Sequence, residues 1–290
     1  MRSRVRSRVW TLAVLAALAV LAGCYTVPET GRRALMLVPQ EQLVSMAAQS
    51  FDQIKEEEPV SEDAAARARV AEVGGRIARV AAKDTGLEPG EWEFVAFADE
   101  QKNAFALPGG QVGAYEGILE VAETDAQLAT VMGHEAAHVA ARHGGERMSE
   151  QLLVQMGGVA LAQALNEKPG QTRQLFLAAY GVGAQVGILL PHSRGQELEA
   201  DRIGLLYLAR AGYDPRAAVD FWERMDNATE AGGEPPVFLS THPPHGKRIE
   251  RLRKWMPQAM EEYRAARERQ TRRMLAAPWP GAGPRIEDAR

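Results

Sequence analysis

The sequence is poor in cysteine and carries no surplus of positive charge. A single cysteine, Cys24, stands among 290 residues, which excludes a disulfide framework within one chain. The 34 Lys and Arg residues are outnumbered by 38 Asp and Glu residues, and the formal net charge at pH 7 is −4. No basic excess is available to release counterions from phosphates, so we expect no nucleic-acid partner. Internal repeats are also absent from this sequence, which argues against a repeat array.

The first 23 residues have the pattern of a bacterial lipoprotein signal peptide. Four arginines occupy residues 1–8, and residues 9–22 form an apolar or small run broken by one threonine. This run is too short for a comfortable membrane span. It ends in Leu-Ala-Gly followed by Cys24, which resembles the lipobox, where the cysteine is acylated and becomes the first mature residue. We therefore expect a lipid anchor on Cys24, and Tyr25 in place of Asp at the next position favours the outer membrane.

One mainly helical domain is expected after this signal peptide. Residues 24–39 are expected to form a membrane-proximal arm with a short strand at 35–38, residues 40–276 the domain, and the Pro- and Gly-rich residues 277–290 a disordered tail. Strands are expected at 92–97, 103–107 and 111–115, and helices at 40–58, 64–83, 115–122, 148–165, 175–190, 196–211 and 246–254. The helices at 148–165 and 175–190 are apolar but interrupted by glutamines, so we expect core packing rather than membrane spans.

The motif that organises the chain is His-Glu-x-x-His at His134, Glu135 and His138. Apolar residues recur around it at helical spacing, and Thr124 followed by Gln127 fits a capping box at the start of the same helix. Residues four apart lie on one face of a helix, so both imidazoles can converge on one zinc ion. Neutral imidazoles leave zinc its Lewis acidity, and a neighbouring carboxylate can take the proton of the attacking water. Glu135 is therefore the candidate catalytic base.

A zinc peptidase needs a third protein ligand, and the candidate lies at residues 196–201, Gln-Glu-Leu-Glu-Ala-Asp. Glu197 and Asp201 share a helix face, so Glu197 can complete a His₂Glu site. Asp201, one turn on, can accept the free ring N–H of a ligand histidine, most plausibly His134. Glu199 points elsewhere and is interpreted as a surface residue or a residue that supports the ligands.

Together these motifs resemble metallopeptidase family 48, which includes the CAAX prenyl proteases and periplasmic lipoprotein zinc peptidases. The resemblance runs over most of the mature chain and also rests on Thr-Gly-Arg-Arg at 30–33, Asn-Ala-Phe-Ala-Leu-Pro-Gly-Gly at 103–110, Ala-Gly-Tyr-Asp-Pro at 211–215 and Ser-Thr-His-Pro at 240–243. It implies an α+β, mainly helical, minigluzincin-like domain with a small β-sheet before the motif helix. It also implies one zinc ion per chain with Glu197 as third ligand, and Asn103 and Ala104 on an edge strand that pairs with substrate.

The histidines outside the motif differ in how much supports them. His143 lies five residues beyond His138, and on one continuous helix it would face about 140° away, so it is given a structural role. His192 and His245 have no motif support. In some periplasmic relatives the histidine of the Thr-His-Pro loop resembles a fourth zinc ligand that displaces the catalytic water. His242 is therefore either such a latch or a residue that stabilises the oxyanion.

The sequence thus predicts a zinc metalloendopeptidase that is lipid-anchored through Cys24 and faces the periplasm. Its expected substrates are unfolded, misfolded or misassembled envelope proteins. The alternative is a chaperone-like binding factor whose zinc site is occluded and rarely turns over. The sequence carries no signal for an oligomeric state.

Overall fold

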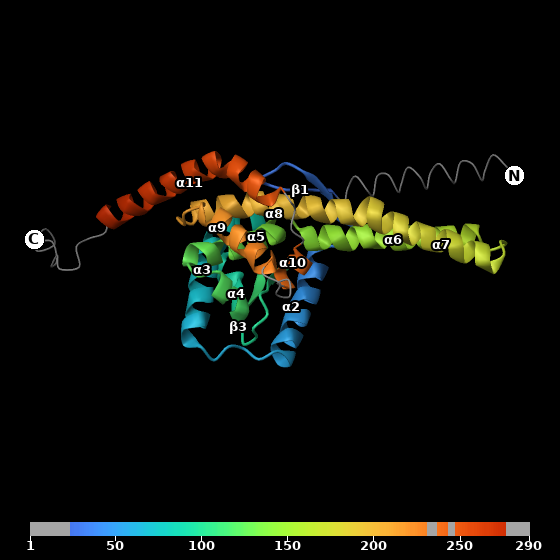
Figure 1. Ribbon diagram of the computed structural model, residues 1–290, viewed down its shortest axis with the longest axis horizontal. Helices are drawn as coiled ribbons and strands as arrows, with labels where there is room; N and C mark the ends of the chain where they lie inside the picture. Colours follow the sequence, from blue (N-terminus) through green and yellow to red (C-terminus); the bar gives the residue numbers. More distant parts are fainter. Residues whose placement is uncertain (1–23, 231–236, 243–246, 277–290) are drawn as a thin grey trace, which may run out of the picture.

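The computed structural model describes residues 24–230, 237–242 and 247–276. The expected signal peptide, the expected C-terminal tail and His245 lie outside these residues. The described chain is mainly helical and has two small sheets, the larger of which precedes the motif helix along the chain (Figure 1). The expected α+β fold class with a small sheet before the motif helix is therefore confirmed.

The elements follow the expected order, with different bounds at several ends. The strands are β1 (Cys24–Thr26), β2 (Arg33–Leu35), β3 (Glu93–Phe97), β4 (Ala104–Leu107) and β5 (Gln111–Tyr115). The helices are α2 (Gln40–Glu57), α3 (Ala64–Thr85), the 3-10 turn η1 (Pro89–Glu91), α4 (Glu116–Val121), α5 (Asp125–Ala140), α6 (His143–Ala164), α7 (Gly170–Ala184), the π-helical turn η2 (Gln185–Leu189), α8 (Leu190–Arg210), α9 (Ala217–Glu230), α10 (Val237–Thr241) and α11 (Arg248–Ala276). The last of these runs far beyond the helix expected at 246–254.

The three-stranded sheet leaves β4 at an edge, since the strand order is β3-β5-β4. Strand β3 runs parallel to β5, and β4 runs antiparallel to it with Ala104 opposite Ala114. Gly113 in the central strand has no side chain, and a Cβ atom there would lie 2.4 Å from the ring of Phe105. That ring packs against Phe51 of α2 at a centroid distance of 6.1 Å. Aromatic packing thus holds the sheet against α2, while the outer edge of β4 lies beside α5.

Helix α5 carries the motif and is buried along most of its length. Its N-terminus is fixed by the expected capping box, in which the Gln127 and Thr124 backbone N–H groups each donate to the other residue's side chain at 3.2 Å. The helix ends at Ala140, and Arg142 adopts a left-handed φ of 55°. The chain therefore turns sharply into α6, and residues after Arg142 leave the axis of α5.

Helices α5 and α8 touch through their backbones at Gly133 and Gly204. A Cβ atom on Gly133 would lie 2.9 Å from the carbonyl oxygen of Gly204. A Cβ atom on Gly204 would lie 2.8 Å from the backbone nitrogen of His134. Any side chain at this crossing would push the helices apart, so the two glycines set the distance between His134 and the acidic residues of α8.

The N-terminal arm at residues 24–39, for which we expect a position near the membrane, packs on the domain. Strands β1 and β2 pair as an antiparallel hairpin, and β2 begins two residues before the strand expected at 35–38. The Tyr25 hydroxyl donates to the Ala140 carbonyl oxygen at 2.8 Å, and Val27 is fully buried in the main core. The arm is thus part of the folded body.

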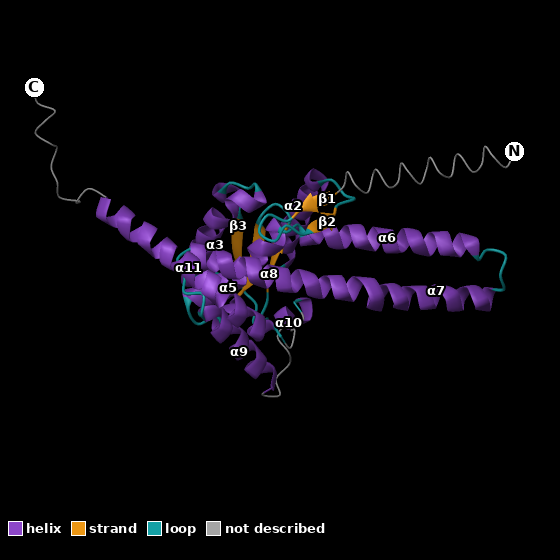
Figure 2. Ribbon diagram, turned by 90° about the horizontal axis from the view of Figure 1, so that it is seen from above, coloured by secondary structure: helices purple, strands orange, loops and turns teal. Residues whose placement is uncertain are grey.

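Helix α6 and the continuous helix formed by α7, η2 and the start of α8 project from one side of the body as an antiparallel pair (Figure 2). We name residues 148–193 the apolar hairpin. We expected its helices to pack in the core, and this expectation is wrong. Met156 on α6 is 65 % exposed, and Leu175 and Val182 on α7 are 70 % and 65 % exposed. The hairpin extends beyond the body, so no other element of the described chain covers most of its apolar surface.

The glycine contact between α5 and α8 generates a stability prediction. We expect Gly204→Ala to lower the free energy of unfolding by roughly 1–3 kcal/mol, because the added methyl group overpacks the crossing. Zinc affinity should fall as well, since the donors on the two helices move apart. The matched control is Gly195→Ala on the same helix, where an added Cβ atom meets nothing within 4 Å. Urea unfolding and zinc titration of both variants measure the difference, and equal behaviour would contradict the assigned contact.

Candidate metal centre

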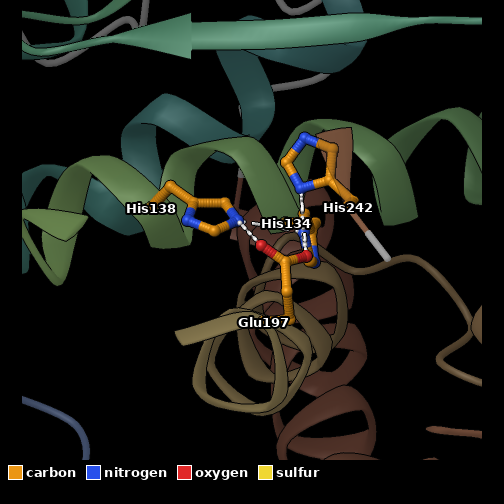
Figure 3. A group of neighbouring side chains, drawn as sticks. All are labelled: His134, His138, Glu197 and His242. Carbon is orange, nitrogen blue, oxygen red and sulfur yellow. Dashed lines mark hydrogen bonds and ion pairs between the residues drawn. The ribbon is translucent and has the colours of Figure 1, made fainter. Parts of the chain in front are cut away.

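Four side chains from three separate segments of the chain meet beneath the surface. His134 and His138 come from α5, Glu197 from α8, and His242 from the residue that follows α10 (Figure 3). All four are buried, and each offers one ligand atom within 4.8 Å of the others. Helical spacing aligns the two α5 histidines, whereas Glu197 and His242 are delivered by the tertiary fold.

The distances among these atoms suit a zinc ion. The Nε2 atom of His134 lies 3.1 Å from the Nε2 atom of His138 and 3.3 Å from a carboxylate oxygen of Glu197. The same His138 atom lies 3.5 Å from the other Glu197 oxygen, which has no hydrogen-bond partner among the described residues. Tetrahedral ligands about 2.1 Å from zinc stand about 3.4 Å from one another. Two imidazoles and a carboxylate at this spacing therefore fit the ion.

His242 occupies a place among the same donors. Its Nδ1 atom lies 3.0 Å from an oxygen of Glu197 and 3.1 Å from the Nε2 atom of His134. The ring of Phe238 lies 4.5 Å away by centroid distance and holds α10 against this site. His242 can therefore serve as a fourth ligand, and its ring covers the metal centre.

Asp201 and Arg248 support the donors from behind. An oxygen of Asp201 lies 3.0 Å from the Nδ1 atom of His134, so the free ring nitrogen has an acidic partner. The Arg248 guanidinium donates to the other Asp201 oxygen at 2.6 Å and to Glu197 at 3.3 Å. It also stacks over the Trp222 ring at 3.9 Å. Arg248 was missed by sequence reasoning, because within a basic helix nothing distinguishes an arginine that turns inward.

The charges of this group favour a cation. Burial lowers the pKa of His134, but hydrogen bonds to Asp201 and Glu197 outweigh burial and raise it to about 9. Burial raises the pKa of Glu197, but the surrounding histidines outweigh this and hold it well below its usual range. The pKa of His138 is lowered by burial, which keeps that imidazole neutral and ready to bind a metal. The buried carboxylates of this group need positive charge nearby, and a bound zinc ion would supply it.

Glu135 lies beside the four donors and is 2 % exposed. One of its oxygens lies 3.5 Å from the Nε2 atom of His242, and its carboxylate accepts a hydrogen bond from the backbone N–H of Ala106 on β4. Burial raises the pKa of Glu135, which moves it toward neutral pH and makes the carboxylate a better proton acceptor. Of the two expected substrate-pairing residues, Ala104 begins the same edge strand and Asn103 lies directly before it.

His143 takes a position that sequence reasoning did not foresee. It does not continue α5, because the turn at Arg142 directs it back toward the centre. Its Nδ1 atom lies 2.8 Å from the Nδ1 atom of His138, and its other nitrogen lies 3.0 Å from a carboxylate oxygen of Glu199. His143 is fully buried and Glu199 is 8 % exposed. The pair therefore orients His138 as Asp201 orients His134.

Glu199 also binds the N-terminal arm. Burial raises its pKa, but contacts with His143, Thr30 and Arg32 outweigh burial and lower the pKa to about 2. The Arg32 guanidinium donates to Glu199 at 2.8 Å and to Glu146 on α6 at 2.5 Å. This network explains why the Thr-Gly-Arg-Arg segment and the second acid of the 196–201 motif belong to one site. His192, in contrast, pairs with Glu150 on α6 and takes no part in it.

Comparison with known proteins assigns the family. A model of Peptidase family M48 matches residues 64–256, about two thirds of the chain. The chain belongs to peptidase family M48. Zinc, the metal on which the family depends, fits the donor set of this M48 chain.

Relatives of the M48 chain occur in eukaryotes and bacteria. Mitochondrial metalloendopeptidase OMA1 of Schizosaccharomyces pombe is 41 % identical over 175 residues, which cover 60 % of this chain and 50 % of the relative. The human mitochondrial metalloendopeptidase OMA1 is 32 % identical over 243 residues, which cover 81 % of this chain and 46 % of the relative. The β-barrel assembly-enhancing protease of Yersinia pestis is 33 % identical over 159 residues, which cover 52 % of this chain and 32 % of the relative. The chain spans at most about half the length of these relatives.

The contacts of His143 predict a measurable effect on metal affinity. We expect Glu199→Gln, which keeps the size of the side chain, to weaken zinc binding roughly 10-fold, within the range seen when a partner of a ligand histidine is lost. His143→Ala should weaken zinc binding at least as much, because His138 then loses its orienting hydrogen bond. Competition with a chromophoric chelator gives both dissociation constants. The control is His192→Ala, and an unchanged affinity in Glu199→Gln would refute the orienting role.

Proposed function

We propose that this protein is a zinc-dependent metalloendopeptidase of the bacterial envelope that cleaves misfolded or misassembled envelope proteins. The observation that carries the proposal is the juxtaposition of three metal donors, His134, His138 and Glu197, with Glu135 at the edge of strand β4. A second supporting observation is the relatives, which are named metalloendopeptidases or proteases. Quality control is inferred from the name of the bacterial relative, a β-barrel assembly-enhancing protease.

The residues of the chain divide the chemistry among them. Zinc held by His134, His138 and Glu197 would polarise the peptide carbonyl as a Lewis acid. Glu135 takes a proton from the attacking water and returns it to the leaving amine, and its raised pKa suits both steps. Asp201 keeps the His134 ring oriented through its Nδ1 atom. Each of these groups is buried, so bulk water screens their charges little.

An extended substrate segment fits beside strand β4. This strand is an edge of the three-stranded sheet, so its outer backbone groups can pair with an added strand. Ala104 begins the strand and Asn103 directly precedes it, and Ala106 already donates to Glu135 from the outer edge of the strand. A segment paired there would pass directly over the catalytic carboxylate. Pairing through backbone groups depends little on the side chains of the substrate, so unfolded segments of many proteins can bind in the same way.

The proposed location follows from the lipobox-like segment that ends at Cys24. A lipid on this residue would attach the peptidase to the envelope facing the periplasm, with the outer membrane favoured by Tyr25. The Yersinia pestis relative, named for β-barrel assembly, agrees with this setting. The mitochondrial names of the OMA1 relatives describe eukaryotic proteins, whereas residues 1–24 of this chain resemble a bacterial lipoprotein signal.

We further propose that His242 is a latch that keeps the enzyme latent. It lies among the donors and is 7 % exposed, and a fourth protein ligand there would exclude both water and substrate. The same burial supports the alternative function, a chaperone-like factor with an occluded zinc site. The two functions differ in turnover after the latch is removed. Casein that stays intact at full zinc occupancy, even with His242→Ala, would favour the chaperone-like factor.

The role of Glu135 is tested by Glu135→Gln, since an amide cannot accept the proton of the attacking water. We expect hydrolysis of casein to fall by about 10²- to 10⁴-fold while fold and zinc content stay normal. His134→Ala and Glu197→Ala should instead lose the metal. Initial rates and zinc analysis of the purified variants distinguish these outcomes. Near-normal turnover of Glu135→Gln would show that another group is the base.

The latch is tested by His242→Ala. If His242 blocks the fourth position, the variant should cleave casein faster than the wild type and bind zinc only modestly more weakly, because His134, His138 and Glu197 remain. If His242 instead stabilises the oxyanion, kcat should fall by roughly 10²-fold or more. Rates measured at matched zinc content separate the two roles. A clear drop in kcat would eliminate the latch.

A further inference from the structure

The apolar hairpin carries most of the exposed large hydrophobic residues of the described chain. Ten of the sixteen such residues belong to it: Leu152, Leu153, Met156, Val159, Leu175, Phe176, Val182, Val186, Ile188 and Leu190. A monomeric protein in water rarely keeps so large an apolar surface uncovered. The hairpin therefore marks a surface that something apolar covers.

The length and charge pattern of the hairpin match a lipid bilayer. Twenty residues, 174–193, carry no Asp, Glu, Lys or Arg, and as a helix they extend about 30 Å, the thickness of the hydrocarbon core. The helix that contains them, Gly170–Arg210, is long and apolar enough to cross a membrane, and only 6 % of its most apolar stretch is buried. Charged residues reappear at both ends, with Lys168 and Arg173 at the tip and Arg194 at the base. Charges at both ends of an apolar zone are typical of membrane-inserted helices.

The exposed apolar side chains surround the hairpin rather than forming one stripe. Leu175, Val182 and Val186 share a helix face, whereas Phe176 and Ile188 are exposed on other faces. A second copy of the chain, or a folded protein partner, would cover one face and leave the others in water. Lipid tails cover every face. Six glutamines lie within residues 148–193, but an amide carries no charge and costs less to bury than an ion.

The contact between the two helices resembles packing inside membranes. At Gly157 the ring of Tyr180 lies so close that a Cβ atom would stand 2.2 Å from its hydroxyl oxygen. This hydroxyl donates to the backbone oxygen of Val154 at 2.9 Å, so the polar end of the ring has a partner within the hairpin. Small residues at the contact and internally satisfied polar groups are what a helix pair needs in lipid.

The expected lipid anchor lies at the base of the hairpin. Cys24 and Leu37 line the same surface cavity of about 310 Å³. The backbone N–H of Leu37 donates to the Ser149 hydroxyl at the start of the hairpin at 2.9 Å. A lipid on Cys24 and the apolar hairpin could thus enter one bilayer from the same side of the body.

We propose that the apolar hairpin inserts into the lipid bilayer as a second membrane attachment, independent of a lipid on Cys24. Residues 174–193 cross the hydrocarbon core, and the polar turn at the tip reaches the far headgroups. The metal centre then stays outside the bilayer, close to the membrane surface, because Glu197 follows the inserted segment by one turn of α8. This inference extends the proposed envelope location and does not depend on hydrolysis.

Insertion is tested with the full chain from residue 24 onward carrying Cys24→Ser, so that no lipid can attach and no native thiol remains. Val182→Cys is added and labelled with an environment-sensitive fluorophore. With vesicles of phosphatidylethanolamine and phosphatidylglycerol, we expect a blue-shifted emission that spin labels on the acyl chains quench. The matched control is Met46→Cys on α2, also an exposed apolar position at 45 %, whose label should stay in water.

A flotation assay measures the strength of attachment. Val182→Asp in the Cys24→Ser background should weaken partition into the vesicles about 100-fold, because a carboxylate at the centre of a spanning helix is costly. Met46→Asp should leave partition unchanged, and normal circular dichroism and zinc content of both variants show that the fold is kept. A Val182 label that remains in water with vesicles present would overturn the proposal. A label that becomes shielded without vesicles, as protein concentration rises, would assign the hairpin to a second copy.

These readouts stay separate from the proposed peptidase function. A chain that inserts but never cleaves casein would refute the peptidase and keep the hairpin. A chain that cleaves casein but does not insert would keep the peptidase and refute the insertion of the hairpin. Wild-type protein that takes up no palmitate analogue in cells, yet floats with vesicles through the hairpin, would refute the lipid anchor alone.

Discussion

Helices α5 and α8 cross where Gly133 and Gly204 bring their backbones into contact, and the metal centre depends on that crossing. Helix α5 provides His134, His138 and the carboxylate of Glu135, and α8 provides Glu197 and Asp201. A metal ion tolerates ligand displacements of only a few tenths of an ångström, so the spacing of the helices must be fixed more tightly than side-chain packing usually fixes it. Direct backbone contact achieves this, because glycine leaves no side chain to adjust.

Electrostatics adds a second requirement on the same elements. Three buried carboxylates, Glu135, Glu197 and Asp201, surround the centre, and Arg248 is the buried arginine beside them in the described chain. Such a group is stable only with further positive charge, from protons on histidine or from a metal ion. The second acid of α8, Glu199, extends the network to Arg32 and so ties the N-terminal arm to the ligands. The N-terminal arm, helix α8 and the start of α6 therefore form one structural unit.

The layout of the molecule follows from where apolar surface is placed. The sheet, α2, α3 and α9 lie around α5, whereas the apolar hairpin projects from one side and α11 from the other (Figure 1). With the hairpin inserted, the centre would lie just outside the bilayer, close to the membrane surface. Strand β4 offers extended substrate segments an edge beside Glu135. In this arrangement membrane attachment would select substrates by their location, because backbone pairing with β4 depends little on the substrate sequence.

The sequence by itself determined the features that depend on local geometry. Helical spacing aligned His134 with His138, the capping box began α5, and alternating residues gave the three strands before it. Other features were decided only by the tertiary structure, because they depend on where the chain turns and on what surrounds it. The left-handed turn at Arg142 sent His143 back to the centre, and helix α10 brought His242 among the metal donors. The apolar hairpin shows the limit most clearly, since an apolar helix has the same composition whether protein or lipid covers it.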